Sequence, residues 1–253
     1  MLFEQVDMLK LGLRSAGVPE IEVEEVEHIA GGDLARLRRL LERKRFGEPN
    51  AYLRGTVTRG GREFLIDRRS YIPDTCPELL IRVLINELPF GASVLDVGTG
   101  CGWIAVTLAC ERPDLRIMAC DIDPAALQLA KSNAARHGVD IECFESHFVD
   151  DVPIEPDYVV AVLPYGGDAT DYSWRELEER PQMPAISIFD PRGPLAPQVG
   201  FARSLIQKGW HSRAFVETGY LSASRVRDAL DGVVERLETR TVDQYTYAII
   251  DFG

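Results

Sequence analysis

The sequence predicts an α/β fold in which helices cover both faces of a mostly parallel twisted sheet, preceded by a small N-terminal helical domain. Two observations lead to this prediction. From about residue 76 onward, short apolar runs alternate with segments whose apolar residues recur at helical spacing. Residues 1 to about 46 show only the helical pattern. Such alternation is typical of parallel sheets, because a helix usually connects each strand to the next.

Capping residues and chain breakers divide the sequence into three parts. Asp33 is a candidate N-cap for a helix over Leu34–Phe46, and Gly47-Glu48-Pro49 then ends the helical pattern. Gly60 and Gly61 lie between two short apolar runs, as in a hairpin. We therefore expect a helical domain over residues 1–50, a connector with a β-hairpin over residues 51–75, and a catalytic domain over residues 76–253.

Within the catalytic domain, one helix is delimited clearly. Asp123 is a candidate N-cap, Pro124 suits the first helical position, and Gly138 ends the helix. The predicted helices are Pro77–Glu87, Cys101–Arg112, Pro124–His137 and Phe201–Lys208. The predicted strands are Ser93–Asp96, Arg116–Asp121, Ile141–Phe144, Tyr158–Val162, Ala214–Glu217 and Tyr245–Asp251.

Composition excludes several kinds of protein. The chain has 253 residues and a net charge of −12, so direct binding of nucleic acid is not expected, since such binding needs a face rich in Lys and Arg. The Leu34–Phe46 helix is rich in Arg and Lys, which we interpret as a solvated face, with a surface for an acidic protein or RNA as the alternative.

The chain shows no sign of a membrane, metal or disulfide site. Its five cysteines are odd in number and none lies in a C-x-x-C pair, so we expect free thiols and no metal. The longest apolar run, near residues 158–163, is too short to cross a bilayer, and Glu4 and Asp7 do not suit a secretory signal. We expect a cytoplasmic protein that does not bind membranes.

A glycine-rich turn carries the strongest functional signal. Asp96 ends an apolar strand, and Gly98-Thr99-Gly100-Cys101-Gly102 leads from it into a helix. In an open α/β sheet such a turn lies at the carboxyl end of a strand, where ligands bind. Asp121 ends the next strand about 20 residues later, where a carboxylate accepts hydrogen bonds from ribose hydroxyls. The turn and the acid together predict a site for an adenosine cofactor.

The glycine spacing selects the type of cofactor. Dinucleotide sites have the pattern G-x-G-x-x-G, but Trp103 occupies the place of the third glycine. The pattern found here, G-x-G-x-G preceded by Asp96, suits a cofactor without a pyrophosphate, and we predict S-adenosylmethionine (SAM). The alternatives are a nicotinamide enzyme and a purely structural turn between strand and helix.

In these motifs the chain resembles the PrmC/HemK family. Its members are bacterial methyltransferases that modify the glutamine side-chain nitrogen in the GGQ loop of peptide-chain release factors. The segment Arg45–Gly55 resembles the family's R-x-G-E-P-x-A-Y-L-x-G connector, and Glu217-Thr218-Gly219 is similar to its late E-I-G. The resemblance implies a Rossmann-like class I methyltransferase that uses SAM. The residues that it implies for cofactor binding are Asp96, Gly98, Thr99, Gly100, Gly102, Asp121, Ile122, His147, Phe148 and Val162, with Phe148 stacking on the adenine and His147 packing near it.

Two family motifs are altered. The N-P-P-Y motif becomes Val162-Leu163-Pro164-Tyr165, and Val162 lacks the amide with which the family's Asn holds the acceptor. The I-P-R-P-E-T-E segment becomes Ile72-Pro73-Asp74-Thr75-Cys76-Pro77-Glu78. An unpaired buried amide costs about 1–3 kcal/mol, and a site built for a polar group rejects an unmatched ligand by roughly 10⁴–10⁵-fold. We therefore expect an altered acceptor.

The remaining half of the motif supplies the predicted catalytic residues. Pro164 restricts the backbone, and the ring of Tyr165 is placed to stabilise the sulfonium charge of SAM by about 0.5–2 kcal/mol. The residues predicted to contact the acceptor are Leu163, Asp168, Asp171, Tyr172 and Trp174.

The main functional prediction is a methyltransferase for a small molecule that bears an amine, amide or hydroxyl group. The alternative partner is a release factor, methylated at its GGQ glutamine. Two further alternatives are an enzyme for which SAM is itself the substrate, in an intramolecular displacement, and a SAM-binding protein without catalysis.

Overall fold

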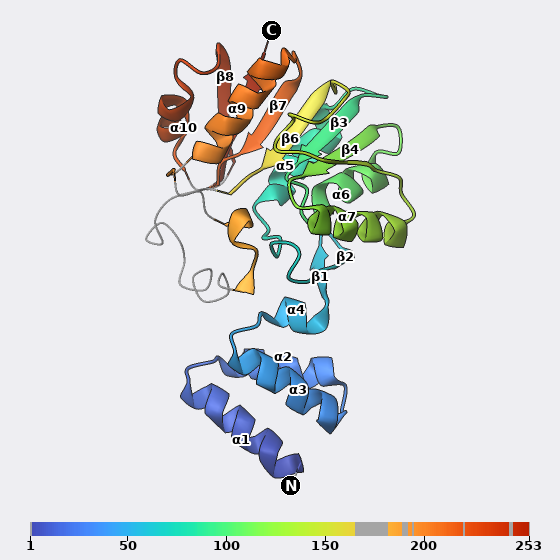
Figure 1. The fold of residues 1–253 in the computed structure, drawn as a ribbon, viewed down its shortest axis with the longest axis vertical. Helices are drawn as coiled ribbons and strands as arrows, with labels where there is room; N and C mark the ends of the chain where they lie inside the picture. Colours follow the sequence, from blue (N-terminus) through green and yellow to red (C-terminus); the bar gives the residue numbers. More distant parts are fainter. Residues whose placement is uncertain are drawn as a thin grey trace.

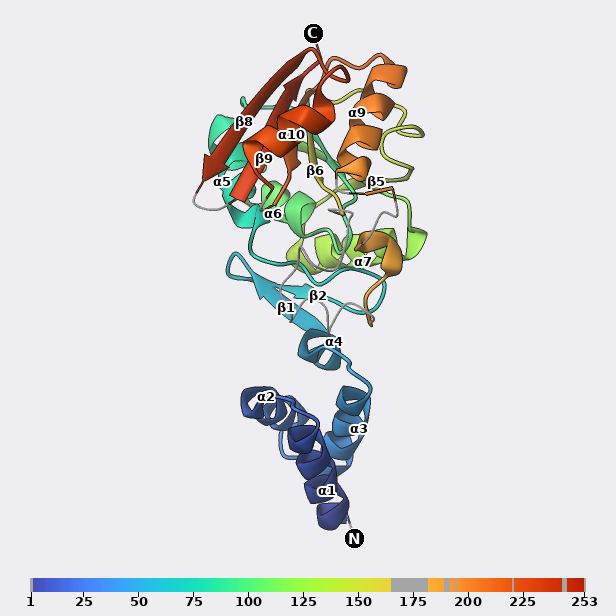
Figure 2. The same ribbon diagram turned by 90° about the vertical axis from the view of Figure 1, so that its left-hand side faces the viewer.

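The computed structural model describes residues 2–164, 182–188, 192–193, 195–219, 221–242 and 245–252. A helical domain at the N-terminal end is joined through a short hairpin to a larger α/β part that contains the C-terminus (Figure 1). Figure 2, turned by 90°, shows the hairpin between the two. The predicted fold class, a mostly parallel sheet with a helical part before it, is confirmed.

The N-terminal domain consists of α1 (Leu2–Ser15), α2 (Glu20–Ala30) and α3 (Leu34–Arg45). These helices pack around a shared core of Val6, Leu13, Val23, Val26, Ile29, Ala30, Leu37, Leu40, Leu41 and Leu53. Asp33 caps α3 as predicted, since its side chain accepts a hydrogen bond from the Arg36 N–H at 2.9 Å. The basic cluster of α3 is partly engaged inside the domain, where Lys44 is buried and pairs with Glu22.

The connector contains a short helix and a tight hairpin. α4 (Asn50–Arg54) precedes β1 (Thr56–Arg59) and β2 (Arg62–Leu65), which pair antiparallel with Arg59 opposite Arg62. Gly60 and Gly61 have φ values of 53° and 74°. Two consecutive residues with positive φ are the requirement of the two-residue turn that matches the twist of a hairpin, and this is why the turn falls at these glycines.

The central sheet has seven strands in the order β5-β4-β3-β6-β7-β9-β8. Neighbours from β5 to β7 are parallel, and β9 is antiparallel to both β7 and β8. The strands are β3 (Ser93–Val97), β4 (Arg116–Asp121), β5 (Glu142–Glu145), β6 (Tyr158–Val162), β7 (Arg213–Glu217), β8 (Arg236–Val242) and β9 (Tyr245–Asp251). The remaining helices are α5 (Pro77–Glu87), α6 (Trp103–Glu111), α7 (Pro124–His137), α9 (Ala196–Lys208) and α10 (Ala223–Leu230), and the short 3₁₀ helix η3 spans Ala185–Ser187.

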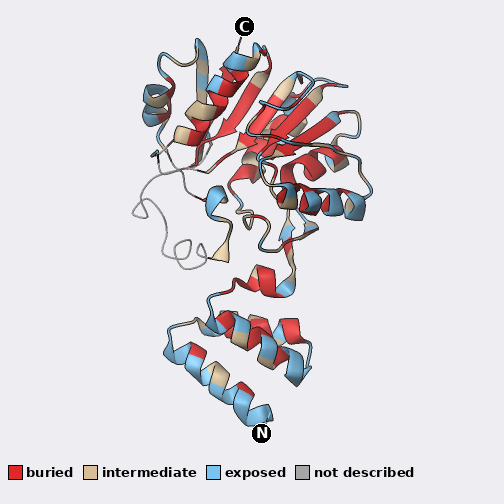
Figure 3. Cartoon of the chain, viewed as in Figure 1, coloured by how far each residue is buried: buried red, intermediate tan, exposed pale blue. Residues whose placement is uncertain are grey.

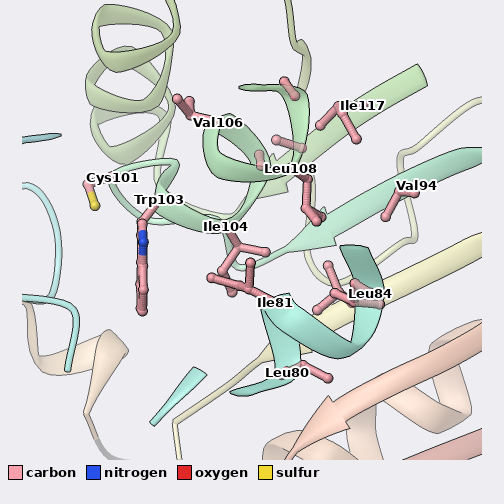
Figure 4. Packing of buried hydrophobic residues seen from close by; sticks show 14 of the residues in the cluster. Leu80, Ile81, Leu84, Val94, Cys101, Trp103, Ile104, Val106, Leu108 and Ile117 are labelled. Carbon is pink, nitrogen blue, oxygen red and sulfur yellow. The ribbon is translucent and has the colours of Figure 1, made fainter. Parts of the chain in front are cut away.

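Helices cover both faces of the sheet, and each face has its own core. α5, α6 and α7 pack on one face, where Leu84, Leu108 and Leu129 are among the buried residues. α9 and α10 pack on the other, where Phe201 and Val226 are buried. Figure 3 shows the buried residues concentrated in the strands and on the inner sides of these helices. Figure 4 shows side chains of α5 and α6 interlocking over β3 and β4.

Most element boundaries agree with the sequence, and the differences have local causes. The helix expected from Cys101 begins at Trp103, because Gly102 has a φ of 83° and cannot belong to a right-handed helix. β8 and α10 were not predicted. β8 is an edge strand rich in polar residues, and α10 is only 8 residues long with two buried apolar residues, Val226 and Leu230, so each gives only a short signal in the sequence.

The strand order fixes where a ligand binds. From β3 the chain crosses to β4 on one side, whereas β6 pairs with β3 on the other side, so the connections diverge at the carboxyl end of β3. Such a switch point is the usual binding crevice of an open α/β sheet. Within the described part of the chain, no helix is both long enough and apolar enough to span a membrane.

Candidate active site

A cavity of about 510 Å³ opens at the carboxyl ends of β3, β4 and β6. Its walls come from the glycine turn after β3, the segments after β4, β5 and β6, and residues 67–74, which we call the strap. The strap connects the hairpin to α5 and contributes Arg69, Ser70, Tyr71, Pro73 and Asp74. Sequence reasoning found the glycine turn and, through the altered family segment, Pro73 and Asp74. It did not connect residues 67–71 with the cavity, since they carry no motif for a cofactor.

The glycine turn is held in a left-handed backbone conformation that favours glycine. Gly100 has a φ of 55°, and a Cβ added there would lie 2.8 Å from the Ser70 hydroxyl oxygen. At Gly102, with a φ of 83°, an added Cβ would lie 2.9 Å from Ala130 of α7. A larger residue at either place would displace the strap or α7, so these glycines let three segments meet at the cavity wall.

Asp96 supports the turn from behind and does not line the cavity. Its side chain is 1% exposed, and its Oδ2 accepts hydrogen bonds from the Thr99 hydroxyl at 2.7 Å and from the Ala105 N–H at 3.2 Å. Burial raises the pKa of Asp96 to about 7. Gly102 also lies behind the wall. These two predicted cofactor residues therefore shape the turn from outside the lining.

Asp121 connects β4 to the glycine turn. Its Oδ2 accepts a hydrogen bond from the Gly100 N–H at 2.9 Å, and its Oδ1 accepts one from the Asp123 N–H at 3.0 Å. Burial raises its pKa. Asp121 and the following Ile122, both predicted to bind the cofactor, line the cavity. A carboxylate has about four acceptor positions, so Asp121 retains capacity for ligand hydroxyl groups.

His147 and Phe148 form an aromatic wall after β5. Their ring centroids lie 4.3 Å apart, and both residues line the cavity. Phe148 has a φ of 51°, and its ring fills the space beside Gly200 of α9, where an added Cβ would lie 3.0 Å away. Because α9 holds this ring, its position is set before any ligand binds.

The wall contributed by β6 is apolar. Val162 and Leu163 line the cavity, and a Cβ added to Gly98 would lie 3.4 Å from the Leu163 side chain. Pro164 also lines it, and its carbonyl accepts a hydrogen bond from the Gln198 side chain at 3.3 Å. The other residues predicted for catalysis and acceptor binding lie outside the described residues: Tyr165, Asp168, Asp171, Tyr172 and Trp174.

Comparison with known proteins gives consistent results. Residues 71–172 match the family model "Methyltransferase small domain". A release factor glutamine methyltransferase from Neisseria gonorrhoeae is 37% identical over 61% of this chain and 58% of its own length. An enzyme of the same name from Koribacter versatilis is 34% identical over 80% of this chain and 74% of its own. The chain belongs to the release factor glutamine methyltransferase family.

Solved structures agree with this family at the level of the fold. A T. thermophilus 16S rRNA N2 G1207 methyltransferase, in complex with AdoMet and guanosine, superposes with a TM-score of 0.55 at 16% identity, covering 78% of this chain and 50% of that one. The family is one of class I methyltransferases, and its cofactor is SAM. The match to the Neisseria gonorrhoeae enzyme spans less than two thirds of that enzyme's length.

As a member of this family, the chain presents a cavity whose residues suit SAM. Eight of the predicted cofactor residues line it together: Gly98, Thr99, Gly100, Asp121, Ile122, His147, Phe148 and Val162. The turn leaves room for a ligand close to the backbone, Asp121 offers acceptors for a ribose, and Phe148 offers a ring face for a base. Trp103, which stands in the place of the third glycine of a dinucleotide site, is 4% exposed and also lines the cavity.

Another part of the cavity wall comes from segments that sequence reasoning missed. Ser187 and Arg192 line the cavity with Pro184, Ile186, Ile188 and Pro197. These residues precede or begin α9 and carry no short motif, so only the folded chain reveals them. Within the described residues, no group of three or more His, Cys, Asp or Glu side chains gathers as a metal site would require.

Proposed function

We propose that the protein transfers the methyl group of SAM to a small amine-bearing acceptor and not to the glutamine of a release factor. The observation that carries this proposal is Val162. It lines the cavity where the family's N-P-P-Y motif has the Asn that holds the acceptor amide. Val162 and Leu163 offer no side-chain hydrogen bond, so a glutamine amide brought to this wall would lose both its donor and its acceptor contacts.

Asp74 supports an amine as the acceptor group. It lies in the strap and lines the cavity, at the position where the family segment I-P-R-P-E-T-E has Arg. The cavity wall therefore carries a negative charge where the family carries a positive one. A carboxylate attracts a protonated amine and repels an acidic group, and it also accepts a proton that an amine must release before methylation.

Methyl transfer from SAM requires mainly that the protein position the donor and the acceptor correctly. Bound SAM supplies an electrophilic methyl group on a positively charged sulfur. The chain's own residues hold the adenosine at Asp121 and Phe148 and present the acceptor across Val162 and Pro164. Correct orientation of two reactants contributes roughly 7–11 kcal/mol to lowering a barrier. We further propose that Tyr165 stabilises the sulfonium with its ring face.

The second candidate function is methylation of the release factor glutamine. It is favoured by the extent of the similarity, because the match to the Koribacter versatilis enzyme covers 80% of this chain. Under this alternative, another group of the protein would have to take over the hydrogen bonds of the missing Asn.

Mass spectrometry distinguishes the two candidates. The purified protein is incubated with SAM and either a recombinant bacterial release factor or a panel of small primary and secondary amines. A family enzyme that retains N-P-P-Y serves as the positive control on the same factor. We expect an unchanged factor mass with our protein, and S-adenosylhomocysteine formed only with an amine. A factor that gains one methyl group at the control's rate would refute the proposal, and methylthioadenosine above an enzyme-free control would identify SAM itself as the substrate.

A further inference from the structure

A buried carboxylate joins the helical domain to the strap. Glu48 has a side chain that is 5% exposed, and it lies between α3 and α4. Its Oε2 accepts a hydrogen bond from Arg43 Nε of α3 at 2.8 Å, and Arg43 Nη2 lies 2.5 Å from its Oε1. Arg68 of the strap approaches Oε2 from the other side at 3.4 Å. Arg43 holds the pKa of Glu48 below its usual range, so this carboxylate is charged at neutral pH.

The strap is also fixed from the connector. Tyr52 of α4 is 4% exposed, and its hydroxyl donates a hydrogen bond to the Ser70 carbonyl at 2.6 Å. Arg59 of β1 donates through Nε to the Pro73 carbonyl at 2.7 Å. Tyr52 and Arg59 do not themselves line the cavity. Both determine where the strap lies.

The strap in turn touches the cofactor turn. Ser70 is 3% exposed, and its hydroxyl oxygen lies where a Cβ on Gly100 would meet it at 2.8 Å. The same hydroxyl donates a hydrogen bond to the Tyr71 carbonyl at 3.1 Å, within the strap. The Gly100 N–H donates to Asp121, the acid predicted to hold the ribose. Contacts therefore link α3 to Glu48 and Glu48 to Arg68 of the strap, whose side chain is 55% exposed. Buried contacts continue from Tyr52 to Ser70, which lies against Gly100, and from the Gly100 N–H to Asp121.

We propose that Glu48 and Tyr52 are positioning residues for the cofactor, which act through Ser70 to set the glycine turn and so couple the helical domain to SAM affinity. The coupling is reciprocal by thermodynamic linkage, so cofactor binding also fixes the helical domain relative to the sheet. This goes beyond the proposed function, because it holds for any methyl acceptor.

Calorimetric titration with S-adenosylhomocysteine tests the proposal without any acceptor. Tyr52→Phe removes only the hydroxyl, and we expect it to raise Kd about fivefold, the effect of one lost hydrogen bond. Glu48→Gln removes the charge, and we expect a rise of about tenfold. Glu42→Gln is the matched control, because Glu42 lies in α3 and pairs with Arg38 at the surface, away from the strap. It leaves Kd within twofold of the wild type.

A double mutant separates positioning from simple stability. If Tyr52 acts through Ser70, Tyr52→Phe has little further effect on Kd in a chain that already carries Ser70→Ala. Hydrogen–deuterium exchange of residues 67–74 and 98–102, measured with and without S-adenosylhomocysteine, follows the coupling directly. Additive effects on Kd, or a lowered Tm with unchanged Kd in both Tyr52→Phe and Glu48→Gln, would overturn the proposal.

Discussion

Val162 of β6 lies directly opposite Glu217 of β7 in the parallel ladder, at the edge of the sheet where the cavity opens. Both belong to the face that packs against α5, since residues in register on parallel strands point to the same side. Glu217 is 2% exposed, and its carboxylate accepts the Gly219 N–H at 2.7 Å. The family's late acid is thus retained beside Val162, at the position where the N-P-P-Y motif of the family has Asn.

Val162→Asn restores a side-chain amide to this wall. We expect it to raise the rate of release factor methylation by roughly 10–100-fold, which corresponds to about 1–3 kcal/mol for an amide that regains its partners. Rates are measured by incorporation of labelled methyl groups into purified factor. Val162→Leu is the control, because it keeps the wall apolar. Equal rates for the wild type and both variants would show that residue 162 does not select the acceptor.

Asp121→Asn tests the predicted ribose contact. The substitution preserves shape but removes the charge that strengthens hydrogen bonds to ligand hydroxyls, each worth about 1.5–3 kcal/mol. We expect the Kd for S-adenosylhomocysteine to rise by roughly 10–100-fold in calorimetry. Asp140→Asn, an exposed acid beyond α7, is the control. An unchanged Kd in Asp121→Asn would remove this residue from the cofactor site.

Gly100→Ala and Gly138→Ala form a matched pair. Both glycines have positive φ, 55° and 67°, so both variants carry a left-handed strain of about 1–2 kcal/mol. Only Gly100→Ala also forces a Cβ against Ser70, whereas nothing lies within 4 Å of a Cβ at Gly138. We expect urea denaturation to give a larger loss of unfolding free energy for Gly100→Ala, together with lost S-adenosylhomocysteine binding. Equal losses in the two variants would contradict the close approach of strap and turn.

The buried Asp96 predicts a pH dependence of stability. Because its pKa is about 7 in the folded chain and about 4 when unfolded, the folded state binds more protons between these values. Stability contributed by this group is therefore present at low pH and is lost as pH rises towards 7, by about 1.4 kcal/mol per pH unit. Asp96→Asn removes this slope while keeping acceptors for Thr99 and Ala105.

The measurement is urea unfolding of the wild type and Asp96→Asn at pH 5, 6, 7 and 8. We expect the stability difference between the two proteins to shift in favour of the variant up to about pH 7 and then to level off. A difference that is constant over this range would show that Asp96 titrates normally in the folded protein.

Local signals in the sequence predicted much of the fold. The bounds of α7, Pro124–His137, agree fully with the prediction, because an N-cap, a proline and a glycine specify both ends. The glycine turn and Asp121 were also found, since their spacing reflects one βαβ unit. β8 was not predicted, because it is an edge strand and the sequence of β8 is mostly polar.

The cavity wall was predictable only in part, for a geometric reason. Ser70 meets Gly100 across the fold, and Ser187 reaches the same cavity from a segment that follows β6. Such contacts depend on how the strap and the chain before α9 cross the sheet edge, and no periodicity or cap encodes this crossing. The altered β6 motif could be identified only by its resemblance to a family, because Val162 and Leu163 alone are typical of any buried strand end.

The strand order described above also bears on how such enzymes diversify. Most of the predicted cofactor residues come from the turn after β3 and from the segments at the ends of β4 and β5, whereas Val162 and the predicted acceptor residues lie at the end of β6 and beyond it, on the other side of β3. Substitutions after β6 therefore leave the backbone hydrogen bonds of the glycine turn untouched. A duplicated gene on this scaffold is free to accumulate changes in acceptor preference while purifying selection maintains its methyl donor.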